Sequence, residues 1–337
     1  MRAAPVLVLA LVAACGRGTR DAAADAPPAD TTPSPYGATP AENLRVVPVE
    51  IEVPALPAGW EGMRVAALSD FHLGAWPENE AAAQAAVARA VAQKPDVVVL
   101  LGDYVTRGDD YAALGRVLAP LRGIPAFAVL GDQDMQEDPQ APDTARARVT
   151  QALRGAGVRV LVGERAPFVR RGDTAYVGGV EPFLPRRADW RRADAYAALP
   201  GGASTPLLLA HMPVTGLSLP SEKYAVLLAG HTFCGRIEIP GTPRLVWFNT
   251  EVLPQDADAA TRRIYRVRGT TMFVTCGTGF GYVPVRYGAP PEVAIITLRS
   301  VGGARPDSVA APGADAVNVD SLIEQFTPET VPADSAG

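Results

Sequence analysis

The chain has 337 residues, of which 48% are hydrophobic, so it is long enough to enclose one large core or two small ones. Its formal net charge at pH 7 is −5, which excludes the basic surplus typical of a nucleic-acid-binding protein. We therefore expect no nucleic-acid partner.

The N-terminal segment, residues 1–15, has the character of an export signal. It starts with a basic residue and continues with the apolar run 5–14, which is too short to cross a bilayer as a helix. Two alanines precede Cys15, and this ending resembles a bacterial lipoprotein signal, in which the cysteine is lipidated. An ordinary secretory signal with an incidental cysteine also fits. Both interpretations predict an exported protein of the cell envelope, and a lipidated Cys15 would anchor it to the membrane on its periplasmic or extracytoplasmic face.

Two long segments near the ends are poor in large apolar side chains. Residues 16–44 are mostly Ala, Asp, Pro, Thr and Gly, and residues 301–337 have a similar composition. Such segments bury too little apolar surface to become ordered by themselves. We predict a disordered tether and a disordered C-terminal tail on either side of one folded domain, residues 45–300.

Inside this domain, five short apolar runs each lead directly into polar residues of a kind that binds metals. The runs are 65–68, 97–101, 126–130, 207–210 and 226–230. Continuous runs rich in Val and Leu predict strands that are buried on both faces. The alanine-rich stretches 80–93 and 110–121 predict crossover helices, and the alternating run 164–180, with a turn at Gly172-Asp173, predicts an antiparallel hairpin. Because functional groups collect beyond the carboxyl ends of the strands in open α/β sheets, we expect these polar residues at one edge.

The polar residues after the runs form a series of motifs. They read Asp70-Phe71-His72, Gly102-Asp103, Gly131-Asp132-Gln133-Asp134, His211 and Gly230-His231-Thr232-Phe233. With the later segment 286–292, the series resembles the calcineurin-like metallophosphoesterases, and in particular their bacterial membrane-associated branch. That family has the pattern Asp-x-His, Gly-Asp, Gly-Asn-His-Asp/Glu, a lone His and Gly-His-x-His. The resemblance implies an α/β fold, a four-layer α/β/β/α sandwich of two mixed sheets with metal-site loops at the carboxyl ends of the strands.

The resemblance also implies two sets of metal ligands that share one carboxylate. Asp70 and His72 would bind the first metal, and Asp103 would bridge the pair. The second set would be completed by three further side chains: Asp132, His211 and His231. These oxygen and nitrogen ligands suit Mn, Fe or Zn.

Three positions depart from the family pattern. Phe233 replaces a histidine of the first set, so we expect the second metal to be held well and the first weakly. Asp132 replaces an asparagine, and its charge should strengthen the attraction for a cation while making metal-bound water less acidic. Gln133 replaces the histidine that assists the reacting phosphate, and an amide cannot hand over a proton. Losing a positioned acid costs about 10²–10⁴-fold in rate, so we expect slow catalysis.

The two cysteines that remain after Cys15 leave alternatives open. Cys234 and Cys276 would lie in a compartment that permits disulfides, and both a bridge between them and two buried free thiols fit the sequence. Cys234 or Glu238 could also supply the ligand that is missing at Phe233.

The leading functional hypothesis is a membrane-tethered hydrolase, a metallophosphoesterase that uses metal-activated water on phosphodiesters or pyrophosphates. Its substrate would be a phosphorylated small molecule or a lipid head group. The alternative is a non-catalytic protein that keeps a metal and binds a phosphorylated ligand or a protein partner. A structural lipoprotein with a vestigial site is less favoured, because every ligand of the second set is retained.

Overall fold

The computed structural model describes residues 40–106, 111–135, 144–180, 201, 205–236, 264–301 and 317–318. The predicted signal segment with Cys15, most of the tether and most of the C-terminal tail lie outside these residues. None of the helices in the described ranges has the length and apolar character needed to cross a bilayer.

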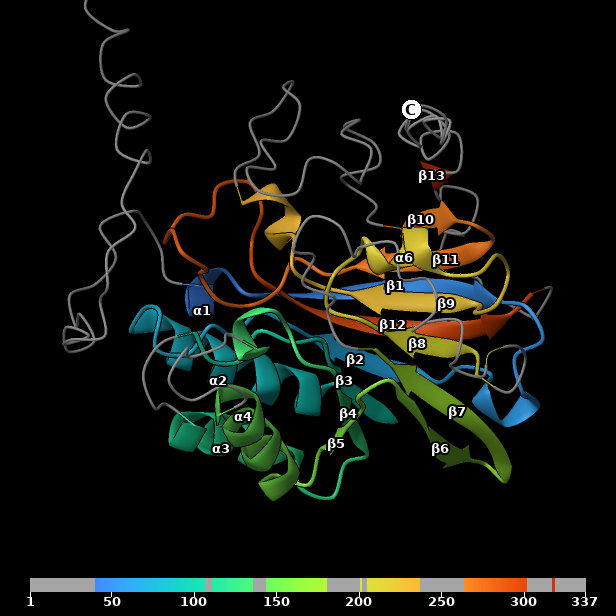
Figure 1. Ribbon diagram of the computed structural model, residues 1–337, viewed down its shortest axis with the longest axis horizontal. Coiled ribbons are helices and arrows are strands. Elements are labelled where there is room, and N and C mark those ends of the chain that lie inside the picture. Colours follow the sequence, from blue (N-terminus) through green and yellow to red (C-terminus); the bar gives the residue numbers. More distant parts are fainter. Residues whose placement is uncertain are drawn as a thin grey trace, which may run out of the picture.

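Six strands form the first sheet, in the order β1-β12-β2-β3-β4-β5. Their bounds are Arg45–Val53 for β1, Glu292–Ser300 for β12, Arg64–Leu68 for β2, Val97–Leu100 for β3, Ala126–Ala128 for β4 and Arg159–Val160 for β5. Strands β2 to β5 run parallel, whereas β12 is antiparallel to β2 and parallel to β1. Figure 1 shows three helices together on one side of this sheet: α2 (Glu78–Ala92), α3 (Tyr111–Leu118) and α4 (Thr144–Gly155).

Seven strands form the second sheet, in the order β13-β10-β11-β9-β8-β7-β6. Their bounds are Val317–Asn318 for β13, Ile264–Val267 for β10, Thr270–Val274 for β11, Val226–Ala229 for β9, Leu207–Leu209 for β8, Asp173–Gly179 for β7 and Glu164–Arg170 for β6. Strands β11, β9, β8 and β7 run parallel, and β6 and β10 each pair antiparallel with a neighbour. The sheet is therefore mixed, as predicted for both sheets.

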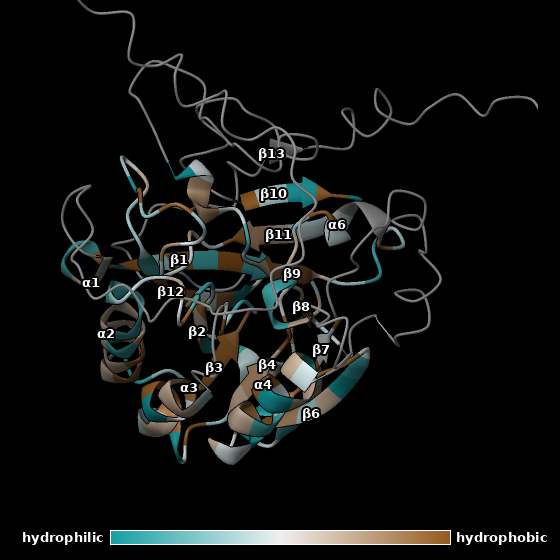
Figure 2. Cartoon of the chain, turned by 60° about the vertical axis from the view of Figure 1, so that its left-hand side comes forward, coloured by the Kyte–Doolittle hydropathy of each residue, from teal (hydrophilic) through white to brown (hydrophobic). Residues whose placement is uncertain are grey.

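Both sheets are buried on both faces, which explains the continuous apolar runs. In β3, Val97 and Val99 point into the core between the sheets, while Val98 and Leu100 point into the core under α2, α3 and α4. In β9, Leu228 joins the core between the sheets and Leu227 a third core on the outer face of the second sheet. Figure 2 shows the hydrophobic colour on central strands such as β2 and β3, whereas helices α2, α3 and α4 carry both hydrophobic and hydrophilic segments.

The elements predicted from the sequence are confirmed with small shifts. All five apolar runs form buried strands, and the crossover helices are α2 and α3, the latter continued by the short 3-10 turn Ala119–Leu121. The predicted hairpin is β6 and β7, with its turn at Arg171 and Gly172, which have φ angles of 50° and 88°. Two consecutive residues with positive φ fit the turn geometry that matches the twist of paired strands.

The ordered chain extends beyond the predicted limits of the domain at both ends. Residues Pro40–Asn43 form α1, which packs on α2, and Leu44 is buried in the core beneath the helices. At the other end, β13 pairs with β10. Over the outer face of the second sheet, the short helix α6 (Thr215–Ser218) lies against β11 and β9, because a Cβ on Gly216 would contact Met272 and Leu227.

Candidate metal centre

Each predicted ligand directly follows a strand, and all the strands concerned end at the same edge of the molecule. The residues are Asp70 and His72 after β2, Asp103 after β3, Asp132 after β4, His211 after β8 and His231 after β9. Four of the six adopt the left-handed backbone region, with φ between 48° at His72 and 71° at His231. Such strained conformations persist where the surrounding structure imposes them, and they cluster at functional sites.

Two glycines explain how the ligand loops come so close. A Cβ on Gly131 would collide with Asp103, and a Cβ on Gly230 would collide with Ser69. The glycine that precedes Asp132 therefore lets the loop of Asp103 approach its backbone, and the glycine that precedes His231 leaves room for the Ser69 side chain.

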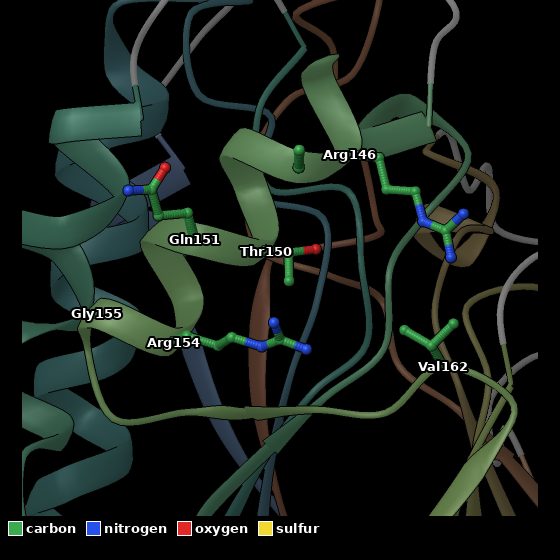
Figure 3. A pocket seen from close by; sticks show the side chains of 7 residues that line it. Arg146, Thr150, Gln151, Arg154, Gly155 and Val162 are labelled. Atoms are coloured by element: carbon green, nitrogen blue, oxygen red, sulfur yellow. The ribbon is translucent and has the colours of Figure 1, made fainter. Parts of the chain in front are cut away.

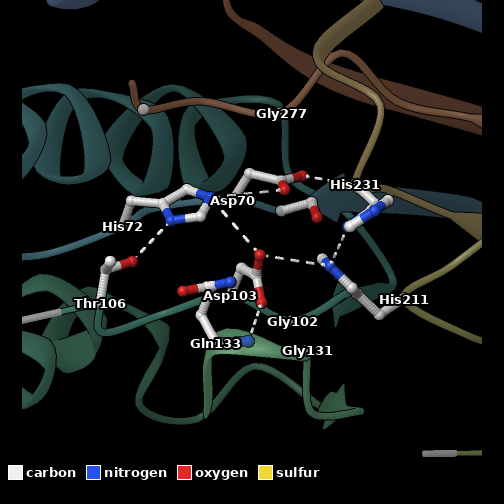
Figure 4. A network of polar contacts seen from close by, with 12 residues as sticks. Asp70, His72, Gly102, Asp103, Thr106, Gly131, Gln133, His211, His231 and Gly277 are labelled. Carbon is white, nitrogen blue, oxygen red and sulfur yellow. Dashed lines mark hydrogen bonds and ion pairs between the residues drawn. The ribbon is translucent and has the colours of Figure 1, made fainter. Parts of the chain in front are cut away.

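The first ligand set consists of Asp70, His72 and Asp103. The Nε2 atom of His72 lies 3.7 Å from Asp70 Oδ1 and 3.5 Å from Asp103 Oδ2 (Figure 4). Asp70 Oδ1 and His72 Nε2 are buried, and neither has a hydrogen-bond partner within the described ranges. Burial opposes the charge of Asp70, but contacts with His72 and His211 hold its pKa at about 2. The set thus presents a charged oxygen and a ring nitrogen toward one point.

The second set is more compact. His211 Nε2 lies 3.3 Å from Asp103 Oδ2, 3.1 Å from Asp132 Oδ1 and 3.0 Å from His231 Nδ1. One ligand atom from each of these four residues lies within 4.8 Å of all the others. Burial opposes the charge of Asp132 as well, yet His211 and His231 hold its pKa well below the usual range. Figure 4 shows Asp103 between the two sets, as a bridging carboxylate requires.

Hydrogen bonds to the far side of two histidine rings orient them as ligands. His211 Nδ1 lies 2.7 Å from the carbonyl oxygen of Leu101, which can only accept, so Nδ1 carries a proton and Nε2 is the ring nitrogen that faces the other ligands. His72 Nδ1 lies 2.6 Å from the hydroxyl of Thr106, which fixes the ring with Nε2 toward Asp70 and Asp103. Both rings are thereby held in the orientation that a metal ligand needs.

Asp134, the last residue of the Gly131-Asp132-Gln133-Asp134 motif, ties two ligand loops together. Its buried carboxylate accepts hydrogen bonds from the backbone N–H groups of Asp103, Tyr104 and Gly131 at 2.8 Å each. The loop after β3 and the loop after β4 therefore share one anchor. Asp134 positions the bridging Asp103 without facing the ligand sets itself.

A family model for calcineurin-like phosphoesterases matches residues 63–234. The chain belongs to this family. A metallophosphoesterase of Aquifex aeolicus, which is described as uncharacterized, is 29% identical over 270 residues, covering 77% of this chain and 93% of that protein. Phosphodiesterase YaeI of Escherichia coli is 26% identical over 227 residues, covering 63% of this chain and 74% of that protein. Among solved structures, a phosphopantetheinyl hydrolase from Mycobacterium tuberculosis has a TM-score of 0.36 at 15% identity, covering 76% of this chain and 100% of that one.

The family implies divalent metals, and the residues present fit them unequally. The second set offers two carboxylates and two imidazoles, a donor set typical of Mn, Fe or Zn. The first set offers two carboxylates and one imidazole, with the unpartnered atoms Asp70 Oδ1 and His72 Nε2 facing each other. Both positions can hold a cation, and among the described residues the first offers three donor side chains where the second offers four.

Phe233, where the family pattern predicts a further ligand, lies beside the first set. Its ring stacks on His72, with centroids 5.2 Å apart and planes inclined by 28°. The disulfide Cys234–Cys276 follows directly and joins this turn to the segment after β11. The hypothesis that Cys234 serves as a replacement ligand is therefore wrong, because a disulfide sulfur carries no thiolate charge. Glu238 lies outside the described residues.

Gln133 is engaged at both ends of its amide. Its Nε2 donates to Asp132 Oδ2 at 2.9 Å, and its Oε1 accepts from the hydroxyl of Tyr282 at 2.7 Å. Its backbone N–H donates to Asp103 Oδ1 at 2.9 Å. The side chain that replaces the family histidine thus connects the second ligand set to the segment around Tyr282.

A separate hollow of about 770 Å³ lies on α4 (Figure 3). Arg146, Thr150 and Arg154 of the helix face Val162 across it, and among the described residues that line it there is no carboxylate or histidine. The hollow therefore does not belong to the metal centre.

Sequence reasoning missed several residues that shape the site: Thr106, Asp134, Arg236, Tyr282 and Arg286. For Asp134 a signal existed in the sequence, because it is the last residue of the motif Gly131-Asp132-Gln133-Asp134. Arg286 begins the segment 286–292 that contributes to the resemblance, but that segment did not indicate a contact with Phe233. For Thr106, Arg236 and Tyr282 no local pattern marks a role, since each reaches the centre only through the path of a loop.

Proposed function

We propose that the chain is a metal-dependent phosphoesterase of the cell envelope that cleaves phosphodiesters or pyrophosphates. The observation that carries this proposal is the convergence of two ligand sets on Asp103, with every second-set ligand present. A divalent metal bound there supplies Lewis-acid stabilisation of phosphoryl charge and makes water more acidic. Family membership supports the same class of reaction.

The chain's own residues make this a slow enzyme that favours good leaving groups. Gln133 holds no proton that it can transfer, and its amide is tied to Asp132 and Tyr282. A leaving group that departs as a stable anion needs no such proton. We therefore propose activated or pyrophosphate-like substrates as those turned over best.

The register of the first sheet supports a membrane-facing site. The start of β12 lies at the carboxyl end of β2, because the two strands are antiparallel, with Ala294 opposite Ala67. β1 runs parallel to β12, with Arg45 opposite Glu292. The chain therefore enters the described fold at the edge that carries the metal ligands. A tether anchored through a lipidated Cys15 would hold this edge toward the membrane.

The segment that leads into β12 carries exposed apolar side chains at the same edge. Tyr282, Val283 and Tyr287 are 54%, 46% and 62% exposed, and the Tyr282 hydroxyl reaches Gln133. Exposed aromatic and aliphatic side chains beside a membrane anchor suit insertion into a lipid interface. We propose that these side chains contact the lipid surface and that the substrate is the phosphorylated head group of a lipid.

The test of the activity uses the full chain with Mn²⁺ and an activated aryl phosphodiester, together with a His231→Ala variant and a measurement of metal per chain. We expect turnover that requires the metal and is lost in His231→Ala. Turnover equal to that of His231→Ala, with metal still bound to the wild-type protein, would favour the alternative of a non-catalytic metal- and phosphate-binding protein.

The membrane orientation is tested in a Cys15→Ser background by co-sedimentation with vesicles of phosphatidylglycerol and phosphatidylethanolamine. We expect Val283→Ser with Tyr287→Ser to lower the bound fraction roughly tenfold, since two apolar side chains no longer enter the interface. Val169→Ser is the matched control, because Val169 is 62% exposed on β6, next to the turn at the opposite end of the parallel strands. Equal losses in both variants would contradict a specific membrane-facing edge.

A further inference from the structure

Arg236 lies on the first-metal side of the site, three residues after Phe233. Its guanidinium carbon is 4.2 Å from the centroid of the Phe233 ring, and that ring stacks on His72. The chain therefore places a cationic side chain beside the ligand set in which a histidine is missing.

The turn that carries Arg236 is fixed from several directions. Phe233, Cys234 and Arg236 all have positive φ, between 51° and 59°. The Arg236 N–H donates to the Phe233 carbonyl at 3.0 Å, and the Tyr287 N–H donates to the Arg236 carbonyl at 2.7 Å. The Cys234–Cys276 disulfide ties the turn to the segment after β11. The position of Arg236 thus results from the fold and not from a loose surface loop.

A second arginine over the same ring provides a contrast. The Arg286 guanidinium carbon lies 5.1 Å from the Phe233 centroid, but its donors bond the carbonyl oxygens of Gly279, Cys276 and Ala289 at 2.7–3.3 Å. Arg286 therefore holds its own segment in place. Arg236 is also partly buried, and its charge is attracted by the carboxylate of Asp70, a member of the first ligand set.

A guanidinium that lies over an aromatic ring uses its face for that contact. The N–H groups of a guanidinium lie in its plane, in a fork that matches two oxygens of a phosphoryl group. The three nearby carboxylates, Asp70, Asp103 and Asp132, would repel an anionic substrate in the absence of compensating cations. A first metal with one ligand missing compensates this negative charge poorly, and Arg236 lies beside that ligand set, over the Phe233 ring.

We propose that Arg236 is an anion-binding residue, which contacts a phosphoryl oxygen of the ligand on the Phe233 side of the metal centre. The cation held on Phe233 provides the attraction that a well-held first metal provides when a histidine occupies this position. The proposal takes its ligand class from the proposed function, but it concerns binding and not turnover.

The experiment measures the affinity of the Mn²⁺-loaded full chain for inorganic phosphate by calorimetry, together with metal per chain and thermal unfolding. We expect Arg236→Gln to weaken phosphate binding about tenfold, the size of one charge-assisted hydrogen bond. The phosphate affinity of Arg236→Lys should lie between those of the wild type and Arg236→Gln, because lysine keeps the charge and loses the planar fork of N–H donors. Metal content should stay unchanged in both variants. Arg116→Gln is the control, since Arg116 pairs with Glu80 on the exposed surface of α3 and should leave phosphate binding unaltered.

Equal phosphate affinity in the wild type and Arg236→Gln overturns the inference, as does a loss of metal in Arg236→Gln or a wild type that binds no phosphate. If Arg236→Gln does not fold, Arg236→Lys decides, and an affinity equal to that of the wild type counts against the fork. Arg236-dependent phosphate binding without turnover would refute the proposed activity and leave this inference standing. Turnover with phosphate binding that is independent of Arg236 would refute this inference and leave the proposed activity standing.

Discussion

The two ligand sets share Asp103 yet are completed by different means. In the second set, His211, His231 and Asp132 bring two rings and a carboxylate to within about 3 Å of one another. In the first set, the fourth position holds the Phe233 ring, with arginine side chains over it. The difference teaches that one shared carboxylate can join a set of four donor side chains to a set of three that lies beside an aromatic ring and two arginines.

The largest expected difference between the sets concerns their histidines. His211→Ala should lower the affinity for the tightly held metal by more than about 100-fold, which exceeds the loss typical of a supporting partner. His72→Ala should leave that metal in place, because His72 belongs to the first set and reaches the second only through the shared Asp103. The number of metal ions that each variant retains per chain after dialysis measures both effects. Equal losses in the two variants would mean that the sets act as one unit.

Restoring the histidines of the family pattern at positions 233 and 133 should complete the first ligand set and return a proton donor. Phe233→His should raise bound metal from one to two per chain, since an imidazole there adds the fourth ligand of the first set. With Gln133→His added, the rate on an unactivated phosphodiester should rise by about 100-fold or more, because a proton donor returns. Gln133→His alone separates the contribution of the proton donor from that of the added metal ligand. A double variant that still binds one metal would show that Arg236 and Arg286 keep the position closed to a cation.

The smallest expected effect concerns the charge that distinguishes the second set from its family pattern. Asp132→Asn should weaken metal binding about tenfold, because the amide oxygen still coordinates while the negative charge is lost. Titration of the metal-free chain with Mn²⁺ measures the change. Asp173→Asn serves as the control, because Asp173 lies at the start of β7, at the opposite end of the parallel strands. Tighter metal binding in Asp132→Asn would mean that the repulsion between the carboxylates of Asp103 and Asp132 outweighs the attraction of Asp132 for the cation.

The metal ligands could be predicted because each stands immediately after an apolar run. A run such as 97–101 specifies a buried strand, and parallel strands of one sheet end at one edge, so Asp70 and Asp103 had to meet there. His211 and His231 follow strands of the second sheet, and only the packing of the two sheets brings them to the same place. The hairpin and the crossover helices followed from local periodicity in the same way. The limits of the domain could not be predicted as well, because the burial of Leu44 and the pairing of β13 depend on partners far along the chain.

By itself, the sequence determined the family and, through the family, the two mixed sheets, because the motifs place characteristic residue types directly after strands. Only the tertiary structure decided what surrounds Phe233. The Cys234–Cys276 disulfide spans 42 residues, and Arg236, Tyr282 and Arg286 reach the site from separate loops. Contacts of this kind depend on how loops cross in space, which no local periodicity or motif encodes.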